Sequence, residues 1–289
     1  MAEKTKIPYC DHTANAWRGC QRVHVGCDHC FAAAIAKRNP AMFGIWGSEG
    51  EYGTRVYGGD KVFRDVVRWD RRANKTGVTE RVFWNDMSDT FEVWIGLMRD
   101  SAGRWLGNPH GIEHNWLTMS DIRLRIFETI DATPNLTHIL LTKRPENIWR
   151  MFPEDQNPGM EGIPAYLTNV WLLFSASDQA TLDAGLPYLL ECCNVCPVIG
   201  LSLEPLIGRV VIPEEALQHL RFVVAGGESG AHYRPCEVSW IADIVEQCRA
   251  AGIPVWVKQD SNRYPGRQGR IPDELWNVKE LPTWSKRAG

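Results

Sequence analysis

The segment Val170-Trp171-Leu172-Leu173-Phe174-Ser175-Ala176-Ser177-Asp178 is a continuous apolar run that ends in polar side chains. An apolar run without polar alternation is typical of a strand buried on both faces of a parallel sheet. Five other short runs share this pattern, at 81–84, 138–141, 198–201, 222–225 and 254–257. Helical stretches lie between several of them, at 122–131, 181–192 and 239–251. The repeating β-α unit predicts an α/β protein with parallel strands.

Polar residues follow each of the other runs as well. The segments are Asn85-Asp86-Met87-Ser88-Asp89, Thr142-Lys143-Arg144, Ser202-Leu203-Glu204-Pro205, Gly226-Gly227-Glu228-Ser229-Gly230 and Lys258-Gln259-Asp260. A β/α barrel builds its active site at the carboxyl ends of all its strands, whereas an open doubly wound sheet collects ligand groups at one switch point. The sequence therefore predicts a partial (β/α) barrel, and an open α/β sheet is the alternative.

Composition and charge narrow the class of protein. The chain has 289 residues, of which 44% are hydrophobic and 23% charged, and its mean hydropathy is −0.29. These values exclude a disordered chain and a coiled coil. The formal net charge of −3 argues neither for nor against nucleic-acid binding, because a local groove can still be basic. No apolar run reaches the ~18–20 residues of a membrane helix and residues 1–8 lack a secretory signal, so we expect a soluble, cytoplasmic protein without a membrane partner.

Three cysteines near the start carry the strongest chemical signal. Cys20, Cys27 and Cys30 are spaced C-x6-C-x2-C, directly before an Ala-rich helix expected over 31–38. The positive end of that helix would stabilise thiolates. Three thiolates suit a [4Fe–4S] cluster that keeps one iron open, since such clusters normally take four. The alternative is a structural zinc site completed by Cys10, His12, His24 or His29.

The order of motifs resembles a phage-associated family of the radical S-adenosylmethionine (SAM) superfamily with a displaced three-cysteine motif. The matching segments run collinearly from about Ala14 to Gln259, at 17–20, 26–32, 81–89, 140–146, 202–206, 226–230 and 257–259. The resemblance implies a partial β/α barrel, a [4Fe–4S] cluster on Cys20, Cys27 and Cys30, and SAM as the fourth ligand. Two features depart from the superfamily: its usual spacing is C-x3-C-x2-C, and Gly226-Gly227-Glu228 comes too late to receive the SAM-binding role.

The resemblance also implies a function. It implies a radical SAM enzyme that modifies a nucleic-acid base or nucleotide in phage DNA hypermodification, a means of restriction evasion. One reaction of such enzymes isomerises an N-linked glycyl group on thymidine to a C-linked one, so we expect an isomerase or another nucleobase-modifying activity. A host flavodoxin or ferredoxin would donate electrons, in the host cytoplasm if the chain is phage-encoded. The alternatives are a zinc-stabilised nucleic-acid-binding module and an iron–sulfur electron-transfer protein that does not use SAM.

The strand ends supply the remaining site predictions. Contacts to SAM are expected from Asn85, Asp86, Ser88, Asp89, Ser175 and Ser202. Lys143 and Arg144 are two cations at a strand end, where they would either clamp a carboxylate or phosphate or form a salt bridge with a neighbouring loop. Glu204 would either accept a proton or hydrogen-bond a ribose, or pair with one of those cations.

Other segments receive structural interpretations or stay open. A second C-x2-C lies within 192–196 at a helix-to-strand junction, and we expect its cysteines to be buried and structural. Five basic residues partly at helical spacing form either a phosphate-facing stripe or a solvated face: Arg64, Arg68, Arg71, Arg72 and Lys75. One barrel domain is expected over 1–260, with a lid or insertion at 39–59, followed by a C-terminal extension at 261–289.

Overall fold

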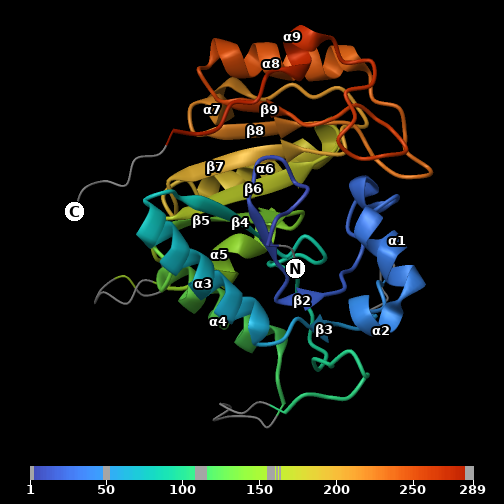
Figure 1. Cartoon of the computed structure of the whole chain (residues 1–289). Helices are drawn as coiled ribbons and strands as arrows, with labels where there is room; N and C mark the ends of the chain where they lie inside the picture. The colour runs from blue at the N-terminus through green and yellow to red at the C-terminus, as the bar shows by residue number, and fades with distance from the viewer. Residues whose placement is uncertain are drawn as a thin grey trace. The chain divides into compact units, whose positions relative to one another are not determined.

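The computed structural model describes residues 3–47, 53–107, 116–154, 160, 162 and 164–283. Residues 48–52 of the expected lid and 284–289 of the expected extension therefore lie outside the described residues. The chain forms two compact units whose segments alternate in sequence. Unit 1 comprises Met1–Val23, Ala32–Leu141 and Arg150–Val170, and unit 2 comprises His24–Phe31, Thr142–Trp149 and Trp171–Gly289. Figure 1 colours the ribbon by residue number, from blue at the N-terminus to red at the C-terminus.

Unit 1 is built on the parallel strands β1 (His12–Ala14), β4 (Glu80–Trp84) and β5 (Leu136–Thr142). Helices α3 (Lys61–Thr76) and α4 (Met119–Asp131) pack on each other, and α3 also contacts β1 and β4 (Figure 1). The short strands β2 (Trp17–Arg18) and β3 (Val56–Tyr57) pair antiparallel. Two further helices follow the first cysteine segment, α1 (Phe31–Arg38) and α2 (Pro40–Phe43).

Local sequence sets the ends of the helices in unit 1. Thr118 and Asp121 form a reciprocal capping box that satisfies the first free N–H groups of α4. Helix α3 ends at Gly77, whose φ of 68° is left-handed and suits a residue without a Cβ. The His138 imidazole is enclosed in the core, where it accepts a hydrogen bond from Trp84 Nε1 at 3.0 Å. Burial lowers the pKa of His138 to about 3, so this ring is neutral in the folded protein.

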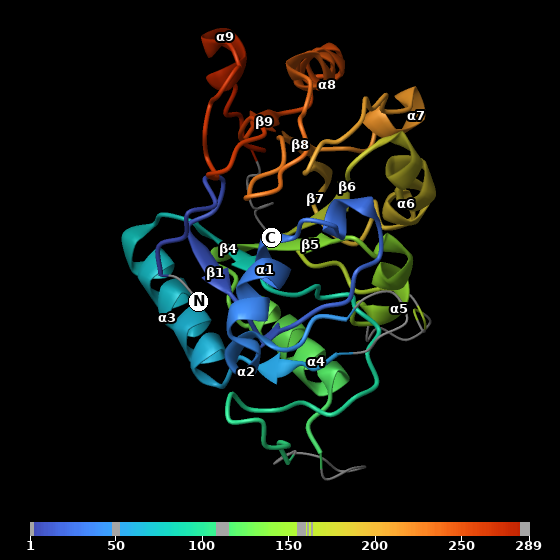
Figure 2. The ribbon, with the colours of Figure 1, turned by 90° about the vertical axis from the view of Figure 1, so that its right-hand side faces the viewer.

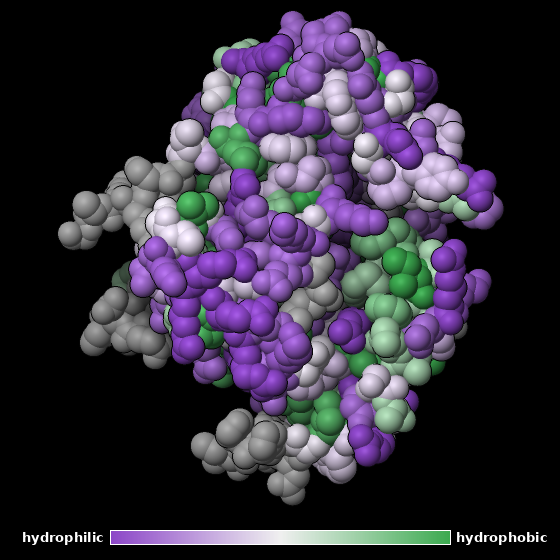
Figure 3. Space-filling model, viewed as in Figure 1, coloured by the Kyte–Doolittle hydropathy of each residue, from purple (hydrophilic) through white to green (hydrophobic). Residues whose placement is uncertain are grey.

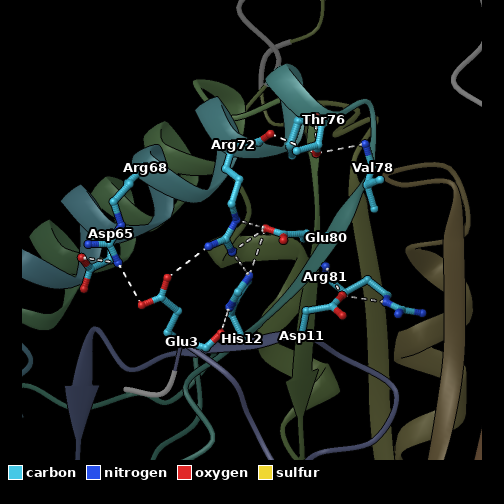
Figure 4. A network of polar contacts seen from close by, with 11 residues as sticks. Glu3, Asp11, His12, Asp65, Arg68, Arg72, Thr76, Val78, Glu80 and Arg81 are labelled. Carbon is cyan, nitrogen blue, oxygen red and sulfur yellow. Dashed lines mark hydrogen bonds and ion pairs between the residues drawn. The ribbon is translucent and has the colours of Figure 1, made fainter.

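The first residues of β1 and β4 join a polar network that ties the chain start to α3 (Figure 4). Arg72 Nη2 lies 2.8 Å from Glu80 Oε2, and Arg72 Nη1 lies 3.0 Å from Glu3 Oε1. His12 Nε2 lies 3.1 Å from the same Glu80 oxygen, and its ring stacks on Trp69 with centroids 4.1 Å apart. Because these groups lie where β1 and β4 begin, the network stabilises the amino ends of the two strands. It does not involve their carboxyl ends, where the sequence predicts the functional site.

Unit 2 contains the parallel strands β6 (Val170–Ala176), β7 (Val198–Leu203), β8 (Phe222–Ala225) and β9 (Val255–Val257). Between them lie α6 (Gln179–Glu191), α7 (Glu214–Leu217) and α8 (Val238–Ala250), and α8 contacts β8 and β9 (Figure 2). The short elements are the 3-10 turns η1 (Val25–Cys27) and η2 (Pro145–Asn147), and helices α5 (Ile148–Met151) and α9 (Asp273–Trp276).

These elements confirm the predicted fold class, α/β with parallel strands of the partial (β/α) barrel type. Each of the six apolar runs coincides with a strand to within two residues at either end, and the expected helix over 31–38 has the bounds of α1. Burial follows the sequence pattern, since every residue of β6, β7 and β8 is buried. Strand β1 was not predicted from the sequence.

Candidate functional site

Two of the three motif cysteines lie on one tight turn of unit 2, which we call the thiol turn (residues 24–30). Its backbone is folded by hydrogen bonds from Cys27 N to His24 O at 2.9 Å and from Cys30 N to Cys27 O at 3.3 Å. Gly26 is buried against Ser177, which follows β6: a Cβ on Gly26 would stand 2.2 Å from Ser177 Oγ. A side chain at position 26 would therefore push the turn away from β6. Cys27 and Cys30 are half-buried.

A buried carboxylate holds the thiol turn to the loop after β8. Glu228 is 4% exposed, and its Oε2 accepts hydrogen bonds from His29 Nδ1 at 3.0 Å, Arg234 N at 2.7 Å and Arg234 Nε at 3.0 Å. Arg234 Nη2 binds Glu228 Oε1 at 2.5 Å, and Arg234 Nη1 donates to Val25 O at 3.0 Å and lies 3.2 Å from Asp28 Oδ2. We call this group the Glu228–Arg234 clamp. It contacts the turn on both sides of Cys27.

The electrostatics of the clamp favour an ion pair. Burial alone would raise the pKa of Glu228, but the hydrogen bonds from Arg234 and His29 outweigh it and leave that pKa below its ordinary value. The hydrogen bond to Glu228 in turn raises the pKa of Arg234. The motif 226–230, to which the sequence assigned no role, thus supplies a positioning group for the thiol turn.

Residues of unit 2 at the ends of four strands contribute a connected set of polar side chains. Lys143 Nζ, after β5, donates to Ser175 Oγ at 2.6 Å, and Ser175 Oγ donates to Glu204 O at 3.0 Å. Ser202 Oγ donates to Glu204 Oε2 at 3.2 Å, and Lys258 Nζ lies 3.0 Å from Glu204 Oε1. The structure therefore brings together the predicted residues Lys143, Ser175, Ser202 and Glu204. The Glu204 carboxylate has Lys258 as an ion-pair partner, a residue that the sequence interpretation missed although it follows the sixth run directly.

The thiol turn and this polar set are neighbours. His24, the first residue of the turn, has its pKa lowered to about 4, first by burial and then by the positive charge of Lys143, with Arg144 adding to the effect. Arg144 is itself buried, at 5% exposure. The two cations that the sequence predicted as a clamp thus lie close to the turn that carries Cys27.

The third motif cysteine belongs to unit 1, where its backbone is fixed on both sides. Cys20 is buried, its carbonyl accepts a hydrogen bond from Gly47 N at 3.1 Å, and the next peptide donates from Gln21 N to Glu92 Oε1 at 2.9 Å. Glu92 is in turn held by a bidentate pair with Arg55, with both N–O distances at 2.7 Å. Both side chains of the pair are at most 1% exposed. Such a pair restricts the position of the Cys20 peptide.

The predicted SAM-binding residues 85–89 lie in unit 1 and contact the segment that leads to Cys20. Asn85 has a left-handed φ of 57°, which asparagine tolerates better than most residues. Its Oδ1 accepts a hydrogen bond from Ala16 N at 2.9 Å, and Ser88 Oγ donates to Trp17 O at 2.9 Å. These two side chains therefore support the backbone before Cys20.

The two acidic side chains of this turn, Asp86 and Asp89, also accept hydrogen bonds from other residues of unit 1. Asp89 is buried, and its Oδ1 accepts a hydrogen bond from Phe91 N at 2.9 Å. Asp86 accepts a hydrogen bond from Asn15 Nδ2, and burial raises its pKa above the ordinary value. A role of 85–89 in SAM binding stays a prediction, and their observed role is to brace the Cys20 segment.

Four of the other six cysteines are poor ligands. Burial raises the pKa of Cys192, Cys196, Cys236 and Cys248 to about 12 in each case, so these thiols stay protonated at neutral pH. Among the described residues, no group of three or more His, Cys, Asp or Glu side chains is arranged as a ready-made metal site. No described helix is long and apolar enough to cross a membrane.

Fold and site together define an α/β protein that holds a two-cysteine turn beside polar strand ends. Residues 4–98 and 113–274 match the model of one protein family, described as "Protein of unknown function (DUF5131)", and the chain belongs to that family. No curated protein and no solved structure gives a significant match to the chain.

Proposed function

We propose that the protein is a radical SAM enzyme that carries a [4Fe–4S] cluster on Cys20, Cys27 and Cys30. The observation that carries the proposal is the anchoring of the thiol turn in unit 2. Gly26 packs on Ser177 after β6, and the Glu228–Arg234 clamp binds the turn from the loop after β8. A turn fixed in this way, next to the polar ends of parallel strands, supports the proposal of a reaction centre, because a β/α barrel builds its active site at those ends.

The proposed donors of the cluster are three thiols. Cys27 and Cys30 are half-buried on one turn, and Cys20 lies in a peptide segment fixed by Glu92 and Gly47. Three thiolates leave one iron of a [4Fe–4S] cluster open to a further ligand. When bound, the reduced cluster and SAM supply a 5′-deoxyadenosyl radical, with the electron coming from a donor such as a flavodoxin or ferredoxin. His24, the neutral first residue of the turn, adds no positive charge there.

The polar set at the strand ends is proposed to bind the reactants. Lys143 is oriented by Ser175, and the Glu204 carboxylate is oriented by Ser202 and Lys258. Lys143 and Arg144 present cations suited to a carboxylate or phosphate of the substrate. Ser175, Ser202 and the turn 85–89 are the proposed contacts for SAM. Glu204, which is held by Ser202 and Lys258, is proposed to hydrogen-bond a ribose hydroxyl or to accept a proton.

The proposed substrate is a nucleic-acid base or nucleotide, and the specific reaction is isomerisation of an N-linked glycyl group on thymidine to a C-linked one. The motif resemblance supports this choice, and so does the chemistry of the site, because a glycyl group carries a carboxylate that Lys143 and Arg144 can bind. Such an isomerisation changes no atom count: the bond between the glycyl nitrogen and the thymine methyl carbon breaks, a bond from the glycyl carbon to that methyl carbon forms, and the hydrogen taken from the glycyl carbon is returned to the nitrogen. The proposed place of action is the cytoplasm, in the host cell if the chain is phage-encoded, with no membrane partner.

Anaerobic reconstitution with iron and sulfide tests the cluster. We expect about four irons per chain in the wild type and a loss of visible absorption in Cys20→Ala, Cys27→Ala and Cys30→Ala. Cys193→Ala is the matched control, because Cys193 is also half-buried and belongs to the second C-x2-C. Stoichiometric zinc in protein purified without added metal, or equal iron loss in the control, would contradict the proposal and favour a zinc-stabilised module.

A further inference from the structure

The five basic residues of α3 divide into two groups. Two of them belong to the network of Figure 4. Arg68 Nη2 lies 3.2 Å from Asp65 Oδ1 and 3.6 Å from Glu3 Oε2, and Arg72 is bound to Glu80 and Glu3. These two side chains therefore have a structural role, and the interpretation of the whole stripe as one phosphate-binding face is too broad.

The other three, Arg64, Arg71 and Lys75, are exposed, and in the part of the chain that the structure describes none of their side chains makes a hydrogen bond or a close ion pair. We call them the α3 basic row. At 3.6 residues per turn, positions 64, 71 and 75 point within about 40° of one another, so the three cations form one straight line along the helix. Figure 3 shows hydrophilic residues gathered over α3. In a chain of net charge −3, this is a local concentration of positive charge.

A groove of about 470 Å³ runs beside this row, between α3 and α4 in unit 1. Arg64 and Arg71 line it from α3, and Arg125 and Glu128 line it from α4. Arg125 is paired with Asp60, so its charge is partly compensated. The groove thus joins Arg64 and Arg71 to apolar side chains such as Phe63 and Val67, and Glu128, together with Asp60 near Arg64, offsets part of its positive charge.

We propose that the α3 basic row and its groove bind the phosphodiester backbone of duplex DNA. From position 64 to position 75 the row covers about 17 Å of helix, which corresponds to about five base pairs. A stiff line of cations suits a duplex, whose phosphates are fixed in position, because neither partner loses much conformational freedom on binding. The choice of DNA rests on the proposed function, but the contact itself requires neither the cluster nor SAM.

Fluorescence anisotropy with a labelled DNA duplex of about 20 base pairs tests this surface at about 50 and 200 mM salt. The test variant is R64Q/R71Q/K75Q. The matched control is K37Q/R38Q/R249Q, which removes three exposed cations of α1 and α8 and likewise changes the net charge from −3 to −6. Each phosphate contact contributes a slope of about −0.9 to log K against log salt, so three contacts correspond to an about 40-fold difference over this range. We expect the test variant to lose that salt dependence and the control to keep it.

Two results would overturn the inference. One is equal weakening of DNA binding by both variants, which would show an effect of net charge alone. The other is binding of polyglutamate that is as tight as DNA binding and equally sensitive to the test variant, which would indicate an acidic protein as the partner. Thermal unfolding checks that both variants are folded. SAM cleavage is measured in parallel. Salt-dependent DNA binding through the row without SAM cleavage refutes the proposed function only. SAM cleavage without such DNA binding refutes the DNA surface only.

Discussion

Neutralising the buried carboxylate of the clamp is the sharpest perturbation of the thiol turn. Glu228→Gln keeps the size of the side chain but replaces one acceptor oxygen with an NH2 group. Either His29 Nδ1 or an Arg234 donor then faces another donor, and Arg234 loses its buried counter-charge. The variant should therefore loosen the turn without leaving a cavity.

The magnitude follows from the burial of the two partners. Removing one member of a fully buried ion pair costs about 3–5 kcal/mol, because the other charge stays without compensation. Glu228 is 4% exposed, but the Arg234 side chain is 25% exposed and can regain water. We therefore expect a loss of about 2–3 kcal/mol in the free energy of unfolding.

Urea denaturation of the variant and of the exposed control Glu246→Gln measures this loss. The control should change the free energy of unfolding by less than about 0.5 kcal/mol. A double-mutant cycle that combines Glu228→Gln with Arg234→Met isolates the interaction free energy between the two side chains. If Glu228→Gln is as stable as the control and keeps its full iron content after reconstitution, the clamp does not position the turn.

Three further predictions concern the core, the pH and the substrate. Arg55→Met should lower the free energy of unfolding by about 3–5 kcal/mol in urea denaturation, because its buried carboxylate partner then lacks a counter-charge. Stability should fall as the pH drops below about 6.5, down to about 4 for His24 and about 3 for His138, since the unfolded chain takes up protons that the folded chain excludes. Each histidine lowers the free energy of unfolding by up to about 1.4 kcal/mol per pH unit in its range. Denaturation curves at about pH 7 and about pH 5 measure this loss. The double variant Lys143→Met, Arg144→Met should weaken binding of glycyl-modified thymidine DNA and leave uncoupled SAM cleavage unchanged, and unchanged substrate affinity would remove both cations from the binding site.

The fold class was predictable because strands buried on both faces form apolar runs that are visible without any partner. Strand β1 was not, because His12-Thr13-Ala14 is short and mostly polar, and its burial comes from pairing with β4. Its polar side chains are satisfied by contacts such as that of His12 with Glu80, far away in sequence. A strand of this kind has no local signal.

The site was predictable in part for a similar reason. Polar residues after buried strands marked Lys143, Ser175 and Glu204, and the structure links them. The clamp was missed because Glu228 and Arg234 lie about 200 residues from the turn that they hold. Only the fold brings such positions together, so spacing within a motif cannot reveal them.

The production of 5′-deoxyadenosine tests the central claim most directly. The reconstituted wild-type protein is incubated anaerobically with SAM and dithionite, beside the variant Cys27→Ala and the control Cys193→Ala, and the nucleoside is quantified by chromatography. We predict 5′-deoxyadenosine from the wild type and from Cys193→Ala and none above background from Cys27→Ala. A wild-type protein that holds its full iron content and yet forms no 5′-deoxyadenosine would contradict the assignment as a radical SAM enzyme.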